Sequence, residues 1–180
     1  MKALIAAFQF LTTFPVPGGK GIGEKDIADS LPFFPVVGLV IGGAAAVGDF
    51  VFSLLFPSGV AAVLTVLLLV LITGGLHLDG LADTADGIFS VRNRERMLEI
   101  MRDSHIGTMG VLAVFFVLAL KIAALAPLLH DQRLGIIILM PLAGRTAMLL
   151  MLTALPYARK PAYCPPSSSA AGPGSILFSH

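Results

Sequence analysis

The chain has few charged residues and almost no cysteine. Charged side chains make up 13% of its 180 residues, about half the share found in an ordinary soluble domain. The single cysteine, Cys164, has neither a second cysteine for an intrachain disulfide nor a CxxC partner, and we assign it no role. With 12 Lys and Arg against 11 Asp and Glu, the net charge of +1 provides no global field that would favour nucleic acid.

Apolar residues are abundant instead. They account for 56% of the chain, and the mean hydropathy of +0.90 is that of a protein in a bilayer. A helix needs about 20 apolar residues to cross the hydrocarbon core. The sequence therefore predicts an all-α, polytopic integral membrane bundle with about four spanning helices, which we expect at Phe33–Phe56, Val60–Leu78, Gly107–Leu129 and Leu134–Leu155.

The ends of the chain differ from these four runs. The first apolar run, Ala3–Phe14, is too short to span, so we expect an interfacial or re-entrant helix there. Residues 161–180 are rich in Pro, Ser, Ala and Gly, and we expect them to form a disordered, low-complexity tail. Residues 1–160 are then a single membrane domain.

Cations flanking the predicted spans indicate an orientation. Lys and Arg accumulate in cytoplasmic loops of membrane proteins. If the polar stretch Asp79–Ile106 is cytoplasmic, the loops on its side hold most of the cations that flank spans, namely Lys20, Lys25, Arg92, Arg94, Arg96, Arg102, Arg159 and Lys160. Only Arg133 then lies on the other side. We expect a multi-pass protein of the cell (inner) membrane with this polar stretch in the cytoplasm.

Three aspartates follow directly on the second apolar run. In a helix, Asp79, Asp83 and Asp86 stand at i, i+4 and i+7, within roughly a 60° arc. Carboxylates this close repel one another unless a cation or shared protons offset the repulsion, and their hard oxygens suit Mg²⁺ or Mn²⁺. The stripe predicts a metal site at a membrane edge. A solvated helix start, where acidic residues favour the helix dipole, explains only one or two of the three.

Other residues in this stretch are candidate substrate contacts. Gly80 and Gly87 lack side chains and would let a phosphate approach closely, although packing between helices explains glycine equally well. His77 points to nearly the opposite side of a helix from Asp79. It is a candidate general base or substrate contact, and a hydrogen-bonded interfacial histidine is the alternative.

A second cluster leads into the third predicted span. The start of a helix offers backbone N–H groups to an anion, and Arg102 and His105 add charge or hydrogen-bond donors there. Capping of that helix by Asp103 or Ser104 is the alternative, and both can hold together.

Ionisable residues also lie inside the predicted spans. An ionised group there is costly and normally faces a partner or a wet cavity. Lys121 and Arg145 are candidates for binding an anionic substrate or for structural pairing, with Asp49 as a candidate partner. By contrast, Gly38 and Gly42 form a GxxxG pair, which predicts close packing on a neighbouring helix.

Together these parts suggest phosphoryl-type transfer at a membrane surface. Clustered carboxylates can hold a divalent metal, which neutralises a pyrophosphate, while Arg or Lys stabilises charge in the transition state. A hydroxyl group would attack phosphorus.

Four motifs resemble those of the cobalamin synthase family, the adenosylcobinamide-GDP ribazoletransferases. The resemblance covers residues 1–160 and rests on FLTTFPVP at Phe10–Pro17, FPVVGLVIGG at Phe34–Gly43, GGLHLDGLADTADG at Gly74–Gly87 and RDSHIGTMGV at Arg102–Val111. It implies a Mg²⁺-dependent membrane enzyme that joins the cobinamide phosphate of adenosylcobinamide-GDP to α-ribazole or its 5′-phosphate, releasing GMP. Asp79, Asp83 and Asp86 would then hold metal and pyrophosphate, with Asp103 and His105 as further members of the site.

Three alternatives stay open at this point. A CDP-alcohol phosphotransferase also uses spaced aspartates, but its DGxxAR opening is absent, because Asp79-Gly80 is followed by Leu81-Ala82-Asp83-Thr84. A cation-coupled transporter would carry its acidic residues at the membrane midplane rather than at the end of a span. Similar proteins continue past Pro156–Arg159 with further spans, so we expect a C-terminally incomplete domain, and an inactive remnant is the third alternative. The oligomeric state is not indicated.

Overall fold

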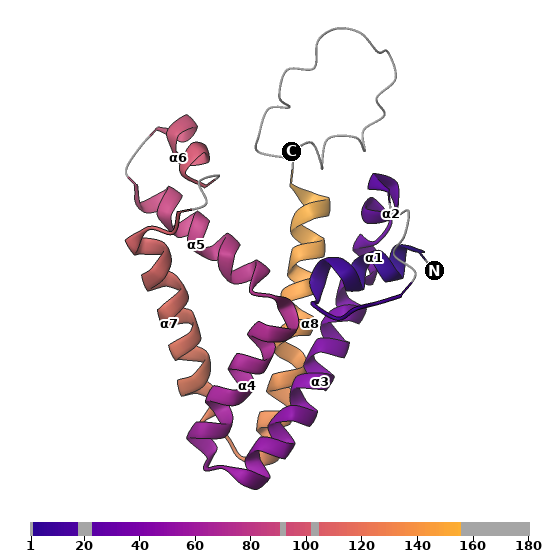
Figure 1. Cartoon of the computed structure of the whole chain (residues 1–180), viewed down its shortest axis with the longest axis vertical. Coiled ribbons are helices and arrows are strands. Elements are labelled where there is room, and N and C mark those ends of the chain that lie inside the picture. Colours follow the sequence, from indigo (N-terminus) through magenta and orange to yellow (C-terminus); the bar gives the residue numbers. More distant parts are fainter. Residues whose placement is uncertain (1, 18–22, 91–92, 102–104, 156–180) are drawn as a thin grey trace, which may run out of the picture. The chain divides into compact units, whose positions relative to one another are not determined.

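The computed structural model of the chain describes residues 2–17, 23–90, 93–101 and 105–155. Every regular element in these ranges is helical, which confirms the predicted all-α class (Figure 1). The elements are α1 (Lys2–Leu11), α2 (Glu24–Ala28), the 3₁₀ turn η1 (Leu31–Phe33), α3 (Phe34–Leu55), α4 (Ser58–Thr73), α5 (Leu76–Phe89), α6 (Arg94–Ile100), α7 (Thr108–Leu125) and α8 (His130–Ala154).

Several helices are long and apolar enough to cross a membrane. They are α7, α8 and the stretch Lys25–Leu55 that contains α3, while α4 and α5 qualify only as a pair bent by 91°. Large apolar side chains on these helices point outward, with Leu54 70% and Leu120 66% exposed. Exposed apolar side chains suit contact with lipid rather than with water. A helix also satisfies its own backbone hydrogen bonds inside a bilayer. The prediction of a polytopic membrane protein is confirmed.

The second predicted span, Val60–Leu78, ends earlier than we expected. Its helix stops at Thr73 because Gly74 and Gly75 adopt left-handed conformations, with φ of 62° and 72°. Only glycine takes such angles without strain. Their N–H groups bond to the carbonyls of Leu71 and Val70 and so complete the end of α4. As a result, the aspartates lie on a separate helix, α5, which leaves α4 at a steep angle (Figure 1).

The chain divides into two compact units, and α3 and α8 each contribute to both. One unit comprises Met1–Gly42 with Ile138–His180, and the other comprises Gly43–Ile137. In the first unit, α1 confirms the predicted short N-terminal helix, although it ends at Leu11 instead of Phe14. Phe10 stacks on Phe34 with ring centroids 6.0 Å apart. The predicted tail, residues 161–180, lies outside the described residues.

In the same unit, α3 packs closely on α8 through two glycines. A Cβ atom built on Gly42 would lie 2.7 Å from the Cα of Ile138, and one on Gly38 would lie 2.8 Å from the carbonyl oxygen of Pro141. Real Cβ atoms do not approach backbone atoms so closely. The GxxxG prediction is confirmed, since only glycine permits this separation of the two backbones.

The second unit contains a buried ion pair that corrects one prediction. We expected a turn at His130–Arg133, but α8 begins at His130, so Arg133 lies in its first turn. Arg133 Nε donates to both oxygens of Asp49 at 2.9 and 3.0 Å, and its side chain is only 3% exposed. The Thr65 hydroxyl donates to the same carboxylate at 2.6 Å. Asp49 is therefore paired structurally, with a cation that we had assigned to a loop.

Ser58 extends this network to the end of α7. Its hydroxyl accepts a hydrogen bond from Arg133 Nη1 at 3.0 Å and donates to the Ala126 carbonyl at 2.5 Å. The network thus links the turn between α3 and α4 to the turn between α7 and α8. It anchors the C-terminal end of α7, while the N-terminal end of α7 meets α5.

Candidate active site

The helix α5 carries the three aspartates, and the structure confirms their helical spacing. Asp79 is exposed, whereas Asp83 and Asp86 are half-buried. Ala82 and Ala85 of α5 are buried, and α5 packs against α7 and α6. Small side chains on this buried face allow a close approach of α7, which lies beside α5 in Figure 1.

Asp86 makes a contact that its sequence position does not reveal. Its carboxylate accepts a hydrogen bond from the backbone N–H of Gly107 at 2.7 Å and another from Gly110 at 2.8 Å. Gly107 is the N-cap residue of α7, and Gly110 is the third residue of that helix. We call this arrangement of Asp86, Gly107 and Gly110 the Asp86 clamp. The anion that we predicted at the start of this helix is thus supplied by the chain itself.

The Asp86 carboxylate leaves no room for a side chain at either glycine of the clamp. A Cβ atom on Gly107 or on Gly110 would collide with the Asp86 carboxylate. On Gly110 it would also lie 3.0 Å from the carbonyl oxygen of Ala82. The close fit of α5 on α7 therefore depends on the absence of side chains at two positions of the RDSHIGTMGV motif.

The residues present fit a metal ion only in part. Among the residues that the structure describes, no group of three or more Asp, Glu, His or Cys side chains could hold a metal ion. Both oxygens of Asp86 already accept a backbone hydrogen bond in the clamp, so Asp79 and Asp83 are the pair that we consider for an ion. Those two lie one turn apart, and Mg²⁺ is usually bound by one or two carboxylates together with substrate phosphates. This pair fits such an ion shared with a pyrophosphate.

Asp79 also lines an open groove of about 460 Å³. Among the described residues that line this groove, Asp79 alone is charged, and the others are glycine or apolar, namely Gly74, Gly75, Leu76, Leu78, Ala82, Ile106 and Val114. Sequence reasoning missed the apolar members, because nothing in their local pattern separates them from residues that face lipid. Such a groove can take an apolar part of a molecule whose charged part lies beside Asp79.

The sequence model described as "Cobalamin-5-phosphate synthase" matches residues 3–171 of the chain. The chain belongs to this family. Curated relatives agree: it is 44% identical to an adenosylcobinamide-GDP ribazoletransferase of Acetivibrio thermocellus over 89% of the chain, and 46% identical to one of Desulforamulus reducens over 88%. A relative of the same name from Roseiflexus is 46% identical over 86%.

The chain spans less than two thirds of the length of these relatives in the cobalamin-5-phosphate synthase family. It covers 64%, 63% and 57% of the lengths of the three relatives. No solved structure matches it.

The remaining predicted site residues of this cobalamin synthase relative have diverse surroundings. Arg102, Asp103 and Ser104 lie outside the described residues, while His105 is exposed and His77 is half-buried. These assignments stay predictions.

The two predicted glycines of α5 differ from each other. Gly87 is buried against Met97 and Met101, because a Cβ there would lie 2.6 Å from Cγ of Met101. Packing therefore explains Gly87. At Gly80 a Cβ would meet nothing within 4 Å, so this position is open to a ligand.

The two cations inside spans lie in different units. Lys121 is half-buried on α7. Arg145 lies on α8, where Nε and Nη2 are buried with no hydrogen-bond partner among the described residues. Its stem lies close to Gly38. Substrate binding by either residue stays a prediction.

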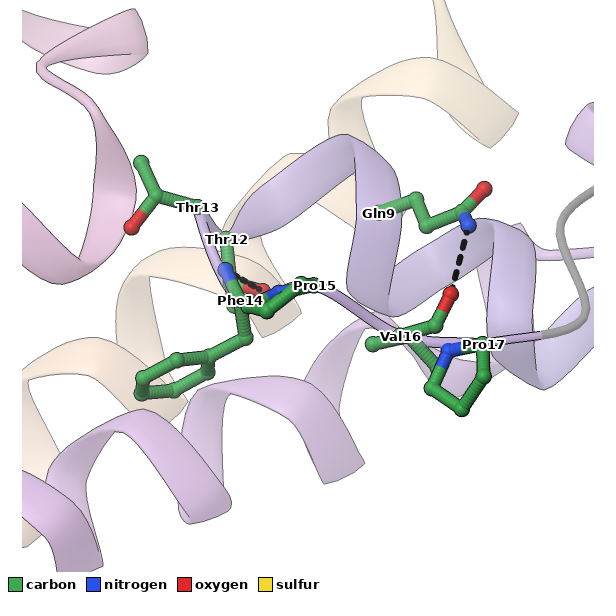
Figure 2. Close-up of a pocket in the computed structure, with 7 residues that line it drawn as sticks. All are labelled: Gln9, Thr12, Thr13, Phe14, Pro15, Val16 and Pro17. Atoms are coloured by element: carbon green, nitrogen blue, oxygen red, sulfur yellow. Dashed lines mark hydrogen bonds between the residues drawn. The ribbon is translucent and has the colours of Figure 1, made fainter.

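The FLTTFPVP motif forms a second groove, of about 600 Å³, in the other unit (Figure 2). Its polar groups bond to one another. The Gln9 amide donates to the Val16 carbonyl at 3.0 Å, and the Thr12 hydroxyl donates to the Phe8 carbonyl at 2.7 Å. The Gln9–Val16 bond, drawn in Figure 2, holds the segment after α1 against that helix. The motif therefore has a local structural role.

Proposed function

We propose that the chain transfers the adenosylcobinamide phosphate moiety from adenosylcobinamide-GDP to α-ribazole or its 5′-phosphate. A hydroxyl of the acceptor forms a bond to the phosphorus that bears cobinamide, the pyrophosphate bond breaks, and GMP leaves with the bridging oxygen. Adenosylcobalamin or its 5′-phosphate is the product. The observation that supports this most is the exposed Asp79, one helical turn from Asp83, beside an apolar groove in a chain of this family.

In this proposal Asp79 and Asp83 hold Mg²⁺. An ion held there would supply positive charge to the pyrophosphate and to the leaving GMP. Gly80, where no atom would oppose a Cβ within 4 Å, leaves room for a phosphate on the same helix. We assign the acceptor's hydroxyl proton to His105 because imidazole titrates near neutral pH and this side chain is exposed. Asp103 and Arg102 complete the site in our proposal.

We further propose that this site faces the cytoplasm from the inner membrane. The support is the excess of Lys and Arg in the loops on the side of α6. Both substrates are polar, and an anionic nucleotide does not cross a lipid bilayer unaided. A site at the cytoplasmic end of α5 would meet its substrates from water while the apolar helices lie in lipid.

One assay tests the reaction. Membranes that carry the chain receive adenosylcobinamide-GDP, α-ribazole and Mg²⁺, and GMP and the corrinoid product are measured by chromatography. We expect GMP release that depends on all three additions and is matched by a corrinoid with its lower nucleotide. If neither product forms beside an active, longer relative in the same preparation, this chain does not catalyse the reaction.

The Asp83→Asn substitution tests the metal assignment. It removes one charge from the proposed Mg²⁺ pair and keeps the shape of the side chain. We expect loss of Mg²⁺-dependent GMP release with unchanged insertion into the membrane. Asp131→Asn, a change of the same kind at an exposed position in the first turn of α8, serves as the control and should leave the rate unaltered. Full activity of Asp83→Asn would refute the assignment.

A further inference from the structure

The Asp86 clamp joins two segments that are distant in sequence. Asp86 lies in the last turns of α5, and the two N–H groups that it binds lie 21 and 24 residues further along the chain. Hydrogen bonds to a charged acceptor are the strong ones, and a carboxylate at the start of a helix also interacts favourably with the helix dipole. One side chain thus ties the helix that bears the aspartates to the start of α7.

The N-cap residue of α7 provides no side-chain cap. Its N-cap residue, Gly107, has extended backbone angles, with φ of −88° and ψ of 174°, and no side chain. A Ser or Asp at such a position would accept the N–H of the third helical residue, which is Gly110 here. Asp86 accepts that bond instead. Among the residues that the structure describes, the cap of α7 is therefore supplied by α5.

The clamp also sets one wall of the groove. Ile106, the residue before Gly107, lines the groove together with Asp79. When Asp86 holds Gly107 by its N–H, it fixes Ile106 with respect to the face of α5 that carries Asp79. His105, to which we assign the acceptor's proton, is the next residue along.

We propose that Asp86 is a positioning residue for the transfer reaction and not a metal ligand. It acts through Gly107 and Gly110 and holds the Ile106 wall in register with Asp79, so that an acceptor bound in the groove is aligned with the pyrophosphate. The catalytic part of this inference rests on the proposed function. The tether between α5 and α7 does not, and it can be measured without substrate or metal.

Two variants separate the cap from the tether. Asp86→Ala removes both. The double variant Asp86→Ala/Gly107→Ser restores a cap within α7 but not the tether. The serine has room there, because the atoms nearest to a Cβ on Gly107 belong to the Asp86 carboxylate, which the alanine substitution removes. Asp131→Ala, at an exposed aspartate outside the site, is the matched control. All variants are prepared in lipid nanodiscs.

The first measurements use metal-free protein in EDTA. Cys164 is replaced by Ser, and spin labels are attached at Ile88→Cys on α5 and Leu112→Cys on α7, both exposed positions. We expect the distance distribution to be narrow in the parent and broad in both Asp86→Ala variants. The midpoint of thermal unfolding should fall by roughly 5–10 °C in Asp86→Ala and recover with Gly107→Ser. A narrow distribution in Asp86→Ala would overturn the tether.

The second measurements concern turnover. We expect the KM for α-ribazole to rise about tenfold in Asp86→Ala and to stay raised with Gly107→Ser, while the Mg²⁺ concentration for half-maximal rate is unchanged. If Gly107→Ser restores the KM, Asp86 acts only as a helix cap and the positioning role is overturned. If Asp86→Ala needs more Mg²⁺ while the distance between the spin labels on α5 and α7 is unchanged, Asp86 is a metal ligand. Absence of turnover in the parent refutes the proposed function, whereas the distances still decide the tether.

Discussion

At the scale of single residues, Asp49, Arg133 and Asp86 are matched to specific partners within the protein rather than to solvent. Arg133 and Asp49 are almost completely buried and bond to each other through several atoms. Neither would be tolerated alone, since an unpaired charge in a membrane-embedded helix is costly. The carboxylate of Asp86 is likewise committed to two backbone N–H groups. Of the three aspartates on α5, Asp79 is the most exposed.

The Asp49–Arg133 pair makes a prediction at this scale. Asp49→Asn and Arg133→Met should each lower the free energy of unfolding by about 3–5 kcal/mol, because each leaves the partner buried without its counter-charge. The double variant Asp49→Asn/Arg133→Met should be more stable than the sum of the two single losses predicts, with a coupling of about 0.5–3 kcal/mol. Reversible unfolding in mixed micelles measures these values. Strict additivity would contradict the pairing.

At the scale of helices, runs of apolar residues located the spans, and glycine decided where helices bend and touch. The first and third predicted spans, Phe33–Phe56 and Gly107–Leu129, agree with α3 and α7 apart from their ends. The second failed at Gly74-Gly75, because glycine is common within membrane helices and the apolar run continues to Leu78 without a polar break. Hydropathy alone contains no information on φ.

Long-range contacts limited the prediction of the site in the same way. The helical spacing of Asp79, Asp83 and Asp86 follows from local sequence and is observed. That Asp86 caps α7 depends on a pairing across more than twenty residues, which no local pattern specifies. The helix start after Arg102 was the available signal, and we interpreted its backbone N–H groups as donors to an anion, with capping by Asp103 or Ser104 as the alternative. We expected a turn at His130–Arg133 between two spans, whereas Arg133 lies in the first turn of α8 and pairs with Asp49.

Two adjacent glycines of α3 provide a matched prediction for helix packing. Gly42→Ala places a methyl group 2.6 Å from the carbonyl oxygen of Ile138, so the backbones of α3 and α8 must separate. We expect a loss of about 1–3 kcal/mol. Gly43→Ala meets nothing within 4 Å and should leave stability unchanged or raise it by up to about 1 kcal/mol. Thermal unfolding in detergent compares them. Equal effects would show that Gly42 is not a packing residue.

At the scale of the whole molecule, the chemistry and the anchoring lie at opposite ends of one helix. The N-terminal end of α7 meets the Asp86 clamp and the Asp79 groove. Its C-terminal end is held by Ser58 and by the Asp49–Arg133 network. A helix of 18 residues is about 27 Å long, close to the thickness of the hydrocarbon core. The groove and the buried network are thus separated by the length of α7, about one hydrocarbon thickness.

This separation makes the orientation of the chain testable. Because Lys and Arg are concentrated in the loops on the side of α6, that side should face the cytoplasm. With Cys164 replaced by Ser, a cysteine at Glu95 on α6 should resist a membrane-impermeant maleimide in intact cells and react only after the membrane is permeabilised. A cysteine at Gln132, at the start of α8, should react in both conditions, and both positions are exposed. The reverse pattern would move the Asp79 groove to the outer face, away from any cytoplasmic nucleotide, and would refute the orientation together with the cytoplasmic site that we propose.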